Sequence, residues 1–516
     1  MNLRVAAIFM LLIFAYSLIN IKIMVSNFNE KTFFVGKEPL LITIITNENK
    51  EHYGIVLFLH GYSGHKESLK LLAYAAASEG LIGVLVDLPG HGGSGGYMES
   101  RATNPRIAQF EDSILEIIEF LRSKGYNLSK LSVVGHSMGG ALACYLGIKY
   151  DIFDAVVGIA PGIGHFVDII PQNFSVSKPK NILFVLAEND VLISEKIVID
   201  AFRRTINQSL EFGKLYNVSG HYREIVKIPK TDHTNVVYKY KTHSIVVSWI
   251  HKILFGDNIT LRFDTQALHN FSQIAEASGL LAFILLIISA YGGYDESRIC
   301  ISKKTLFSAV GLSFFVTIAT IPILLLTRII LAAMIVGCVL GFVLSTLIVE
   351  RIPIKLRKDA LKLKNIVFGL ALGFIPIVIS EITMGTIRFS LMSGFIRRIY
   401  AFPIFLMVST IIFWFYFRVS IFKTNKTSIR IMHEILDIIA LSLPPTILII
   451  LFTLIISPGS LMIILPITSV HIVTIVILSL IGRYLGEMDM STRIILCATV
   501  YAILAINLSP ITKLIL

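Results

Sequence analysis

Three side chains in the first half of the chain have the types and the order that acyl transfer needs. Ser137 lies at the centre of Gly135–Gly139 (GHSMG), a G-x-S-x-G motif between an apolar run and a helical pattern. Glycines at both ends of such a turn let a strand and a helix approach closely, so the serine hydroxyl is raised clear of the backbone. The hydroxyl becomes a nucleophile only when a base removes its proton and an acid orients the base.

The acid and the base are expected after later strands, in that order along the chain. Asp190 follows the apolar run NILFVLA, and His233 follows the run REIVKI. Because the carboxyl ends of parallel strands lie at one edge of a sheet, both side chains should reach the edge where Ser137 projects. We therefore predict Ser137 as nucleophile, His233 as base and Asp190 as the orienting acid.

Competing residues exist for each role. His221 precedes the last apolar run and should lie at the opposite edge of the sheet. Glu188 is very close to its strand end, and Asp232 is adjacent to the base in the sequence. Three further histidines could suggest a metal site: His60, His65 and His91. They fall on two loops without a carboxylate at ligand spacing, so we expect no metal and no cofactor.

The negative oxygen of an acyl-transfer intermediate needs two backbone N–H groups. One is expected from Met138, at the start of a helix whose dipole favours negative charge. The other is expected from Tyr62, in the loop after the apolar run 53–59.

Short apolar runs alternate with helical patterns between residues 27 and 262. The runs contain Val, Ile and Leu without alternation, which is typical of strands buried on both faces. They lie at 53–59, 81–87, 130–135, 154–160, 181–187 and 223–228, and the helical patterns at 66–79, 106–124, 138–149, 194–211 and 234–254. This alternation predicts an α/β fold with a doubly wound, mostly parallel sheet.

Four segments resemble the α/β-hydrolase superfamily, nearest to its serine-aminopeptidase-like and monoacylglycerol-lipase-like group. They are LHGYSGHKES, VDLPGHGGSGG, VVGHSMGG and AENDVLIS. The resemblance covers about 50–255 and implies a triad of Ser137, Asp190 and His233, with Tyr62 and Met138 as oxyanion donors. Two features depart from the group. Only about twenty residues, 161–180, stand where a helical lid is usual, and the interval from acid to base is somewhat long.

The remaining sequence is apolar. Of 516 residues, 54% are hydrophobic and only 16% charged, with a mean hydropathy of +0.75, which excludes a disordered, fibrous or purely soluble chain. Residues 5–21 form one apolar run, and eight further candidate spans lie at 277–293, 305–326, 329–349, 365–387, 399–417, 432–456, 461–482 and 493–508. We predict an uncleaved transmembrane signal anchor (1–26), an α/β-hydrolase domain (27–262) and an all-α polytopic membrane domain (263–516).

Charge and sequons predict the orientation. With a cytoplasmic N-terminus, the inside loops hold fifteen Lys and Arg residues and the outside loops and tail hold five. The net charge of +12 is therefore assigned mainly to membrane topology and not to nucleic acid. Six N-x-S/T sequons favour a glycosylated, extracellular or lumenal hydrolase domain: Asn127, Asn173, Asn207, Asn217, Asn258 and Asn270.

Some residues in the apolar half depart from plain membrane helices. Gly369 and Gly373 have the spacing of close helix packing. Glu381 and His471 are expected to face the interior of the helix bundle, whereas Glu434 and Asp437 are expected nearer the interface.

These features predict a membrane-bound serine hydrolase of the carboxylesterase or lipase type. The expected substrate is an acyl ester, with a membrane lipid as one source. A serine peptidase of the aminopeptidase type remains an alternative, because the triad does not choose between ester and amide. A transporter or receptor with a non-catalytic hydrolase-like domain is the other.

Overall fold

The structure is a computed structural model that describes residues 2–100, 106–293, 299–325, 329–352, 362–385, 390–421, 430–456, 461–507 and 512–514. The chain divides into two compact units. The sheet unit comprises Ala15–Ala275, Thr383–Ser393 and Thr512–Leu516. The helical unit comprises Met1–Phe14, Glu276–Ile382 and Gly394–Ile511.

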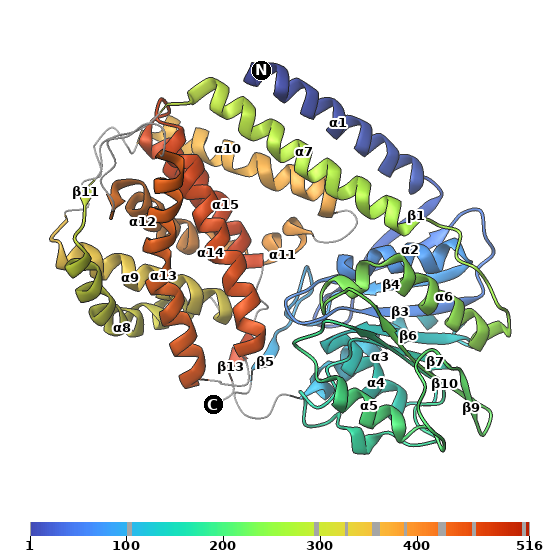
Figure 1. Ribbon diagram of the computed structural model, residues 1–516. Helices are drawn as coiled ribbons and strands as arrows, with labels where there is room; N and C mark the ends of the chain where they lie inside the picture. The colour runs from blue at the N-terminus through green and yellow to red at the C-terminus, as the bar shows by residue number, and fades with distance from the viewer. Residues whose placement is uncertain are drawn as a thin grey trace. The chain divides into compact units, whose positions relative to one another are not determined.

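A nine-stranded sheet in the order β1-β2-β4-β3-β6-β7-β8-β10-β9 forms the centre of the sheet unit (Figure 1). The six strands from β4 to β10 in this order run parallel, and β1, β2 and β9 pair antiparallel. Their bounds are β1 Phe28–Val35, β2 Leu40–Asn47, β3 Gly54–Leu59, β4 Leu81–Val86, β6 Leu131–His136, β7 Ala155–Ile159, β8 Ile182–Ala187, β9 Tyr216–Val218 and β10 His221–Ile228. The predicted α/β-hydrolase fold is confirmed.

The six parallel strands correspond to the six apolar runs of the sequence. Every residue of β3, β4 and β8 is buried, as expected for strands covered on both faces. The antiparallel hairpin of β1 and β2 and the short edge strand β9 were not predicted. Two short pairs complete the strands: β5 Met98–Ser100 pairs with β13 Thr512–Leu514, and β11 Ile299–Cys300 pairs with β12 Val419–Ser420.

Helices connect the parallel strands or follow the last of them. They are η1 Lys66–Leu69, α2 Lys70–Ser78, η2 Ile107–Phe110, α3 Glu111–Ser123, α4 Met138–Lys149, η3 Pro171–Asn173, α5 Glu195–Arg203, η4 Asn235–Tyr238 and α6 Tyr240–Phe255. The prediction of one helix over 194–211 was wrong in its second half. Helix α5 ends at Arg203, and the Thr205 hydroxyl turns back to donate to the Phe202 carbonyl.

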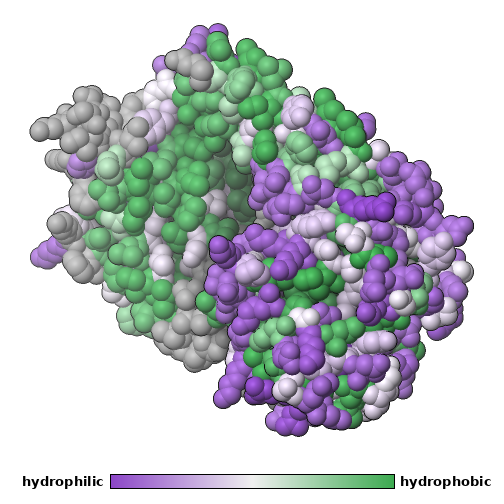
Figure 2. All heavy atoms as spheres, turned by 45° about the vertical axis from the view of Figure 1, so that its right-hand side comes forward, coloured by the Kyte–Doolittle hydropathy of each residue, from purple (hydrophilic) through white to green (hydrophobic). Residues whose placement is uncertain are grey.

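Outside the sheet, the described chain is largely helical. The helices are α1 Leu3–Met24, α7 Thr265–Tyr291, α8 Lys303–Leu325, α9 Ile330–Val349, α10 Leu363–Ser380, η6 Glu381–Gly385, α11 Leu391–Arg397, η7 Ile399–Ala401, α12 Phe402–Arg418, α13 Arg430–Ile456, α14 Leu461–Tyr484 and α15 Met490–Asn507. In Figure 2, hydrophobic residues dominate the helical surface and hydrophilic residues the surface of the sheet unit.

Seven helices in the described part of the chain are long and apolar enough to cross a membrane. They begin at Leu3 and Thr265, and the others cover Ala332–Val349, Leu363–Gly385, Ile399–Arg418, Met432–Leu451 and Met490–Asn507. Two predicted spans, 305–326 and 461–482, fall in α8 and α14. The apolar segments found within these two helices are shorter, Lys304–Thr320 and Thr468–Tyr484. The chain is therefore consistent with a membrane protein.

A buried charge cluster lies inside the helical unit. The Arg483 guanidinium donates to Glu434 at 2.6 Å and to Asp437 at 3.0 Å, and the Arg483 side chain is only 1% exposed. Glu434 and Asp437 are both buried among protein side chains, and their position near the membrane interface stays a prediction. His471 is buried as predicted, with its ring edge against Tyr501.

Helices α10 and α15 pack closely because α10 carries glycines at the contact. A Cβ atom added at Gly373 would lie 2.7 Å from the Thr499 Cβ, and one at Gly369 would lie 2.8 Å from the Thr492 carbonyl oxygen. Such distances leave no space for a side chain.

We predict that Gly373→Leu destabilises the helical unit by about 1–3 kcal/mol, because the larger side chain forces α10 away from α15. The measurement is the thermal unfolding midpoint of the detergent-solubilised protein. Gly311→Leu, also within a helix but with nothing within 4 Å of the added Cβ, is the control and should leave the midpoint close to wild type. Equal effects of the two substitutions would contradict this packing.

Candidate active site

Ser137 lies on a sharp turn between β6 and α4. Its φ of +54° is in the left-handed region, which non-glycine residues seldom adopt. Two hydrogen bonds fix the turn: the Ser137 N–H donates to the Ile159 carbonyl at 3.0 Å, and the Ser137 carbonyl accepts from the Gly162 N–H at 2.9 Å.

The glycines of the motif are needed because backbone segments meet there. A Cβ at Gly135 would overlap the Gly139 carbonyl, and a Cβ at Gly139 would overlap the Leu59 carbonyl at the end of β3. Any larger residue would push α4 away from β3 and β6, so the motif allows the approach that raises the Ser137 side chain.

The three side chains predicted to act together form one hydrogen-bonded chain. The Ser137 hydroxyl lies 2.9 Å from His233 Nε2, and His233 Nδ1 lies 2.8 Å from Asp190 Oδ2. Since an ionised carboxylate only accepts, Nδ1 carries the proton, and Nε2 is left to accept from the serine. This is the hydrogen-bonding pattern that general-base activation of a serine requires.

Asp190 is fixed by its own turn. Its Oδ1 accepts the N–H groups of Leu192 at 2.9 Å and Ile193 at 3.0 Å, so Oδ2 points at the imidazole. Burial alone would raise the pKa of Asp190, but the hydrogen bond from His233 and the two N–H groups outweigh burial and lower it. The carboxyl group is therefore ionised at neutral pH.

The competing residues have other partners. Asp232 accepts from the N–H groups of Thr234 and Asn235 and from the Asn235 amide, and Glu188 accepts from the Lys230 N–H. His221 is the first residue of β10, at the opposite end of the strand from the His233 loop.

Two histidines that the sequence did not single out for positioning hold the loops of the site. His136, the residue before Ser137, donates from Nε2 to the His233 carbonyl at 2.9 Å. His60, at the end of β3, donates from Nδ1 to the Gly61 carbonyl and accepts the Leu88 N–H on Nε2 at 3.0 Å. The place of His136 within the motif was the only sequence signal for this role. Its hydrogen-bond partner could not be read from the spacing, because it lies 97 residues away.

The loop after β3, which carries Tyr62, lies against the serine. A Cβ at Gly61 would be 3.2 Å from the Ser137 Cβ, so glycine permits this contact. Met138 is the first residue of α4, where the backbone N–H has no intrahelical acceptor. Tyr62 packs against the hydrophobic core, and burial raises its pKa to about 12.

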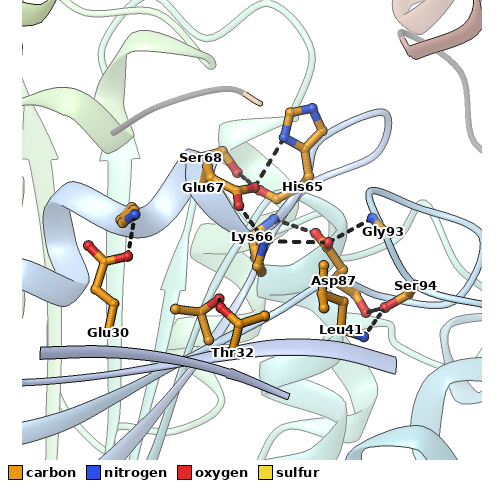
Figure 3. A network of polar contacts seen from close by, with 12 residues as sticks. Glu30, Thr32, Leu41, His65, Lys66, Glu67, Ser68, Asp87, Gly93 and Ser94 are labelled. Carbon is orange, nitrogen blue, oxygen red and sulfur yellow. Dashed lines mark hydrogen bonds and ion pairs between the residues drawn. The ribbon is translucent and has the colours of Figure 1, made fainter. Parts of the chain in front are cut away.

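A buried network of charges fixes the far end of the same loop (Figure 3). Asp87 is fully buried and accepts the Lys66 N–H at 2.7 Å and the Gly93 N–H at 2.9 Å. The Lys66 ammonium lies between Asp87 and Glu67. The loop after β3 and the loop after β4 are thus tied together by one carboxylate.

The segment between β7 and β8 is short, as the sequence indicated. Between Ile159 and Ile182 it contains only the 3₁₀ turn η3, and its Gly162 contacts the Ser137 backbone. In this segment, no helix longer than that turn stands where a lid is usual.

Comparison with known proteins agrees with the fold and the motif. Residues 50–204, about 30% of the chain, match the family described as serine aminopeptidase, S33. The predicted resemblance is therefore confirmed over this segment.

The curated relatives are also hydrolases. The chain is 26% identical over 157 residues to a monoacylglycerol lipase of Mycolicibacterium smegmatis, covering 30% of this chain and 55% of that protein. It is 29% identical over 135 residues to the chloroplastic chlorophyllase-1 of Citrus unshiu, covering 24% of this chain and 38% of that protein. The chain thus spans about half or less of the length of these relatives.

Solved structures match the chain at lower sequence identity. A CIB-like hydrolase from Thermoplasma acidophilum is 16% identical, with a TM-score of 0.34, and the match covers 44% of this chain and 98% of that one. Est1E from Butyrivibrio proteoclasticus, solved with ferulic acid, is 14% identical, with a TM-score of 0.34. This match covers 44% of this chain and 98% of that one.

We predict that acid destabilises the sheet unit through its buried histidines. Burial lowers the pKa of His60 to about 4 and that of His136 to about 3, whereas an unfolded histidine titrates near 6.5. Below about pH 6.5 the unfolded chain therefore binds protons that the folded chain excludes, and stability falls by about 1.4 kcal/mol per pH unit for each histidine until its folded pKa is reached.

The measurement is the thermal unfolding midpoint between pH 7.5 and pH 4.5. His60→Gln should flatten the slope, and His52→Gln, at an exposed position, is the matched control. An unchanged slope in His60→Gln would contradict the assignment of His60 as a neutral buried imidazole.

Proposed function

We propose that the chain is a membrane-bound serine hydrolase that cleaves an acyl ester through an acyl-enzyme. The observation that carries the proposal is the hydrogen-bonded chain from Asp190 through His233 to Ser137. The Ser137 oxygen attacks the ester carbonyl while His233 Nε2 takes its proton. His233 then gives this proton to the leaving alcohol, and Asp190 stabilises the imidazolium formed in between.

The N–H groups of Met138 and Tyr62 are proposed to bind the oxyanion. Met138 supports this role as the first residue of α4, where the helix dipole favours negative charge. Tyr62 supports it because its loop contacts Ser137 through Gly61. Water attacks the acyl-enzyme in the second half of the reaction, with His233 again as the base.

The proposed substrate is an ester with an apolar acyl group, and a membrane lipid is its proposed source. The similarity to a monoacylglycerol lipase and the short segment between β7 and β8 support this choice. The aminopeptidase-like family match keeps amide substrates as the second candidate. A binding-only role, as part of a transporter or receptor, is disfavoured by the complete hydrogen-bonded chain.

The organisation proposed for the whole chain is a signal anchor (1–26), a hydrolase domain (27–262) and a membrane domain (263–516). We propose that the hydrolase domain is extracytoplasmic, from the Lys and Arg asymmetry of the sequence. Some of these charges lie outside the described residues: Arg298, Arg328, Lys355, Arg357, Lys358, Arg388, Lys423 and Lys426. The six sequon asparagines are all exposed, which supports their glycosylation.

We expect a fluorophosphonate probe to label the full-length protein in detergent and Ser137→Ala to abolish both labelling and ester hydrolysis. The substitution removes only the nucleophilic oxygen, so the circular dichroism spectrum and the unfolding midpoint should stay close to wild type. Monoacylglycerol in mixed micelles, a short soluble ester and an aminoacyl amide are the three substrates to compare. A folded wild type without labelling would refute the catalytic proposal, and turnover of the amide alone would favour the peptidase.

Asp190→Asn should lower kcat by about 10³–10⁴-fold, because an amide no longer fixes the His233 tautomer or stabilises the imidazolium. Asp232→Asn is the matched control one residue from the base. The Asp232 oxygens bond only to its own turn, so kcat should change less than about threefold. A larger loss in Asp232→Asn than in Asp190→Asn would mean that the acid was assigned wrongly.

A further inference from the structure

The segment that carries His233 is held from behind by a buried histidine. After His233 the chain forms η4 and then α6, and His243 lies in the first turn of α6. The His243 side chain is fully buried, and its Nε2 donates to the Val237 carbonyl of η4 at 2.7 Å. This bond fixes the short turn between the proposed base and α6.

The other nitrogen of the same ring is held by a different helix. His243 Nδ1 lies 2.7 Å from the Thr265 hydroxyl, and Thr265 is the first residue of α7. Since Nε2 carries the proton, Nδ1 accepts from this hydroxyl. Burial lowers the pKa of His243 to about 4, so the ring is neutral at physiological pH and keeps this arrangement of donor and acceptor.

Two further contacts connect the same elements. The Tyr240 hydroxyl donates to the Leu261 carbonyl at 2.5 Å, just before α7. The ring of Tyr238, the last residue of η4, stacks on the ring of His269 in the second turn of α7, with the ring planes parallel within 1° and the centroids 5.5 Å apart. All of these residues belong to the sheet unit.

Helix α7 is also one of the seven helices that are long and apolar enough to cross a membrane. It runs without a break from Thr265 to Tyr291, and its polar first two turns belong to the sheet unit. The segment of the proposed base is therefore hydrogen-bonded to the beginning of a candidate membrane span and not only to the sheet.

We propose that the first two turns of α7 position His233, with His243 and Thr265 as positioning residues, so that turnover depends on how the membrane holds α7. This inference rests on the proposed serine hydrolase function. A shift of α7 along its axis would move the Thr265 hydroxyl away from His243 and release the η4 turn. The distance between His233 Nε2 and the Ser137 hydroxyl would then vary, and proton transfer depends steeply on that distance.

The first experiment uses the full-length protein in lipid nanodiscs and a short, water-soluble ester, so that access of a lipid substrate does not affect the rate. Thr265→Val keeps the side-chain shape and removes the hydroxyl. We expect kcat per folded molecule to fall about tenfold with KM changed less than twofold, and Thr265→Ser to restore kcat. Gln266→Ala is the matched control on the same turn, because the Gln266 side chain bonds only to Asn270 within α7.

The second experiment varies bilayer thickness. Wild-type kcat for the soluble ester should differ at least threefold between nanodiscs of dimyristoyl and dierucoyl phosphatidylcholine, and Thr265→Val should reduce this dependence. Wild-type kcat that is equal in both lipids overturns the membrane dependence. A lower unfolding midpoint in Thr265→Val with unchanged kcat overturns the positioning role.

Fluorophosphonate labelling separates failure of this inference from failure of the proposed function. If wild type is labelled at Ser137 but Thr265→Val behaves as wild type, only the role of α7 is refuted. If wild type is not labelled at all, the proposed hydrolase function itself is refuted.

Discussion

The left-handed backbone at Ser137 is the constraint on which the rest of the site depends. A non-glycine residue at a φ of +54° is strained by about 1–2 kcal/mol, and this strain persists only because the surrounding structure fixes it. Gly135 and Gly139 let α4 approach β3 and β6, and the hydrogen bond to the Ile159 carbonyl ties the turn to β7. The turn leaves the hydroxyl at the carboxyl edge of the sheet, where the loops after β8 and β10 bring Asp190 and His233 to it.

Three neutral imidazoles connect the loops around the site through hydrogen bonds. His60 joins the loops after β3 and β4, His136 joins β6 to the His233 backbone, and His243 joins η4 to α7. A histidine suits this task because one neutral ring offers a donor and an acceptor on opposite sides. Burial keeps the ring neutral, which is also why acid should weaken all three junctions together.

The strands and the three side chains of the candidate site were readable from the sequence because their signals are local. Buried parallel strands are continuous apolar runs, and Ser137, Asp190 and His233 each follow one of them. The β1 and β2 hairpin was missed because it precedes the recognisable motif and pairs at the edge of the sheet. The end of α5 at Arg203 and the partners of His60, His136 and His243 depend on contacts between distant residues, which spacing does not encode. The burial of Glu434 and Asp437 was missed for the same reason, because Arg483 lies almost 50 residues away.

The choice of acid follows from where the carboxylate oxygens are hydrogen-bonded. An orienting acid must be fixed by its surroundings and still keep one oxygen for the imidazole. Both oxygens of Asp232 bond to residues of its own turn, and neither is hydrogen-bonded to His233. Glu188 accepts from the Lys230 N–H and so braces the loop after β10. Asp190 alone among these three divides its oxygens, with Oδ1 on two backbone N–H groups and Oδ2 on His233. Proximity to the base in sequence is therefore a poor guide, because the carboxylate next to His233 is hydrogen-bonded within its own turn and not to the imidazole.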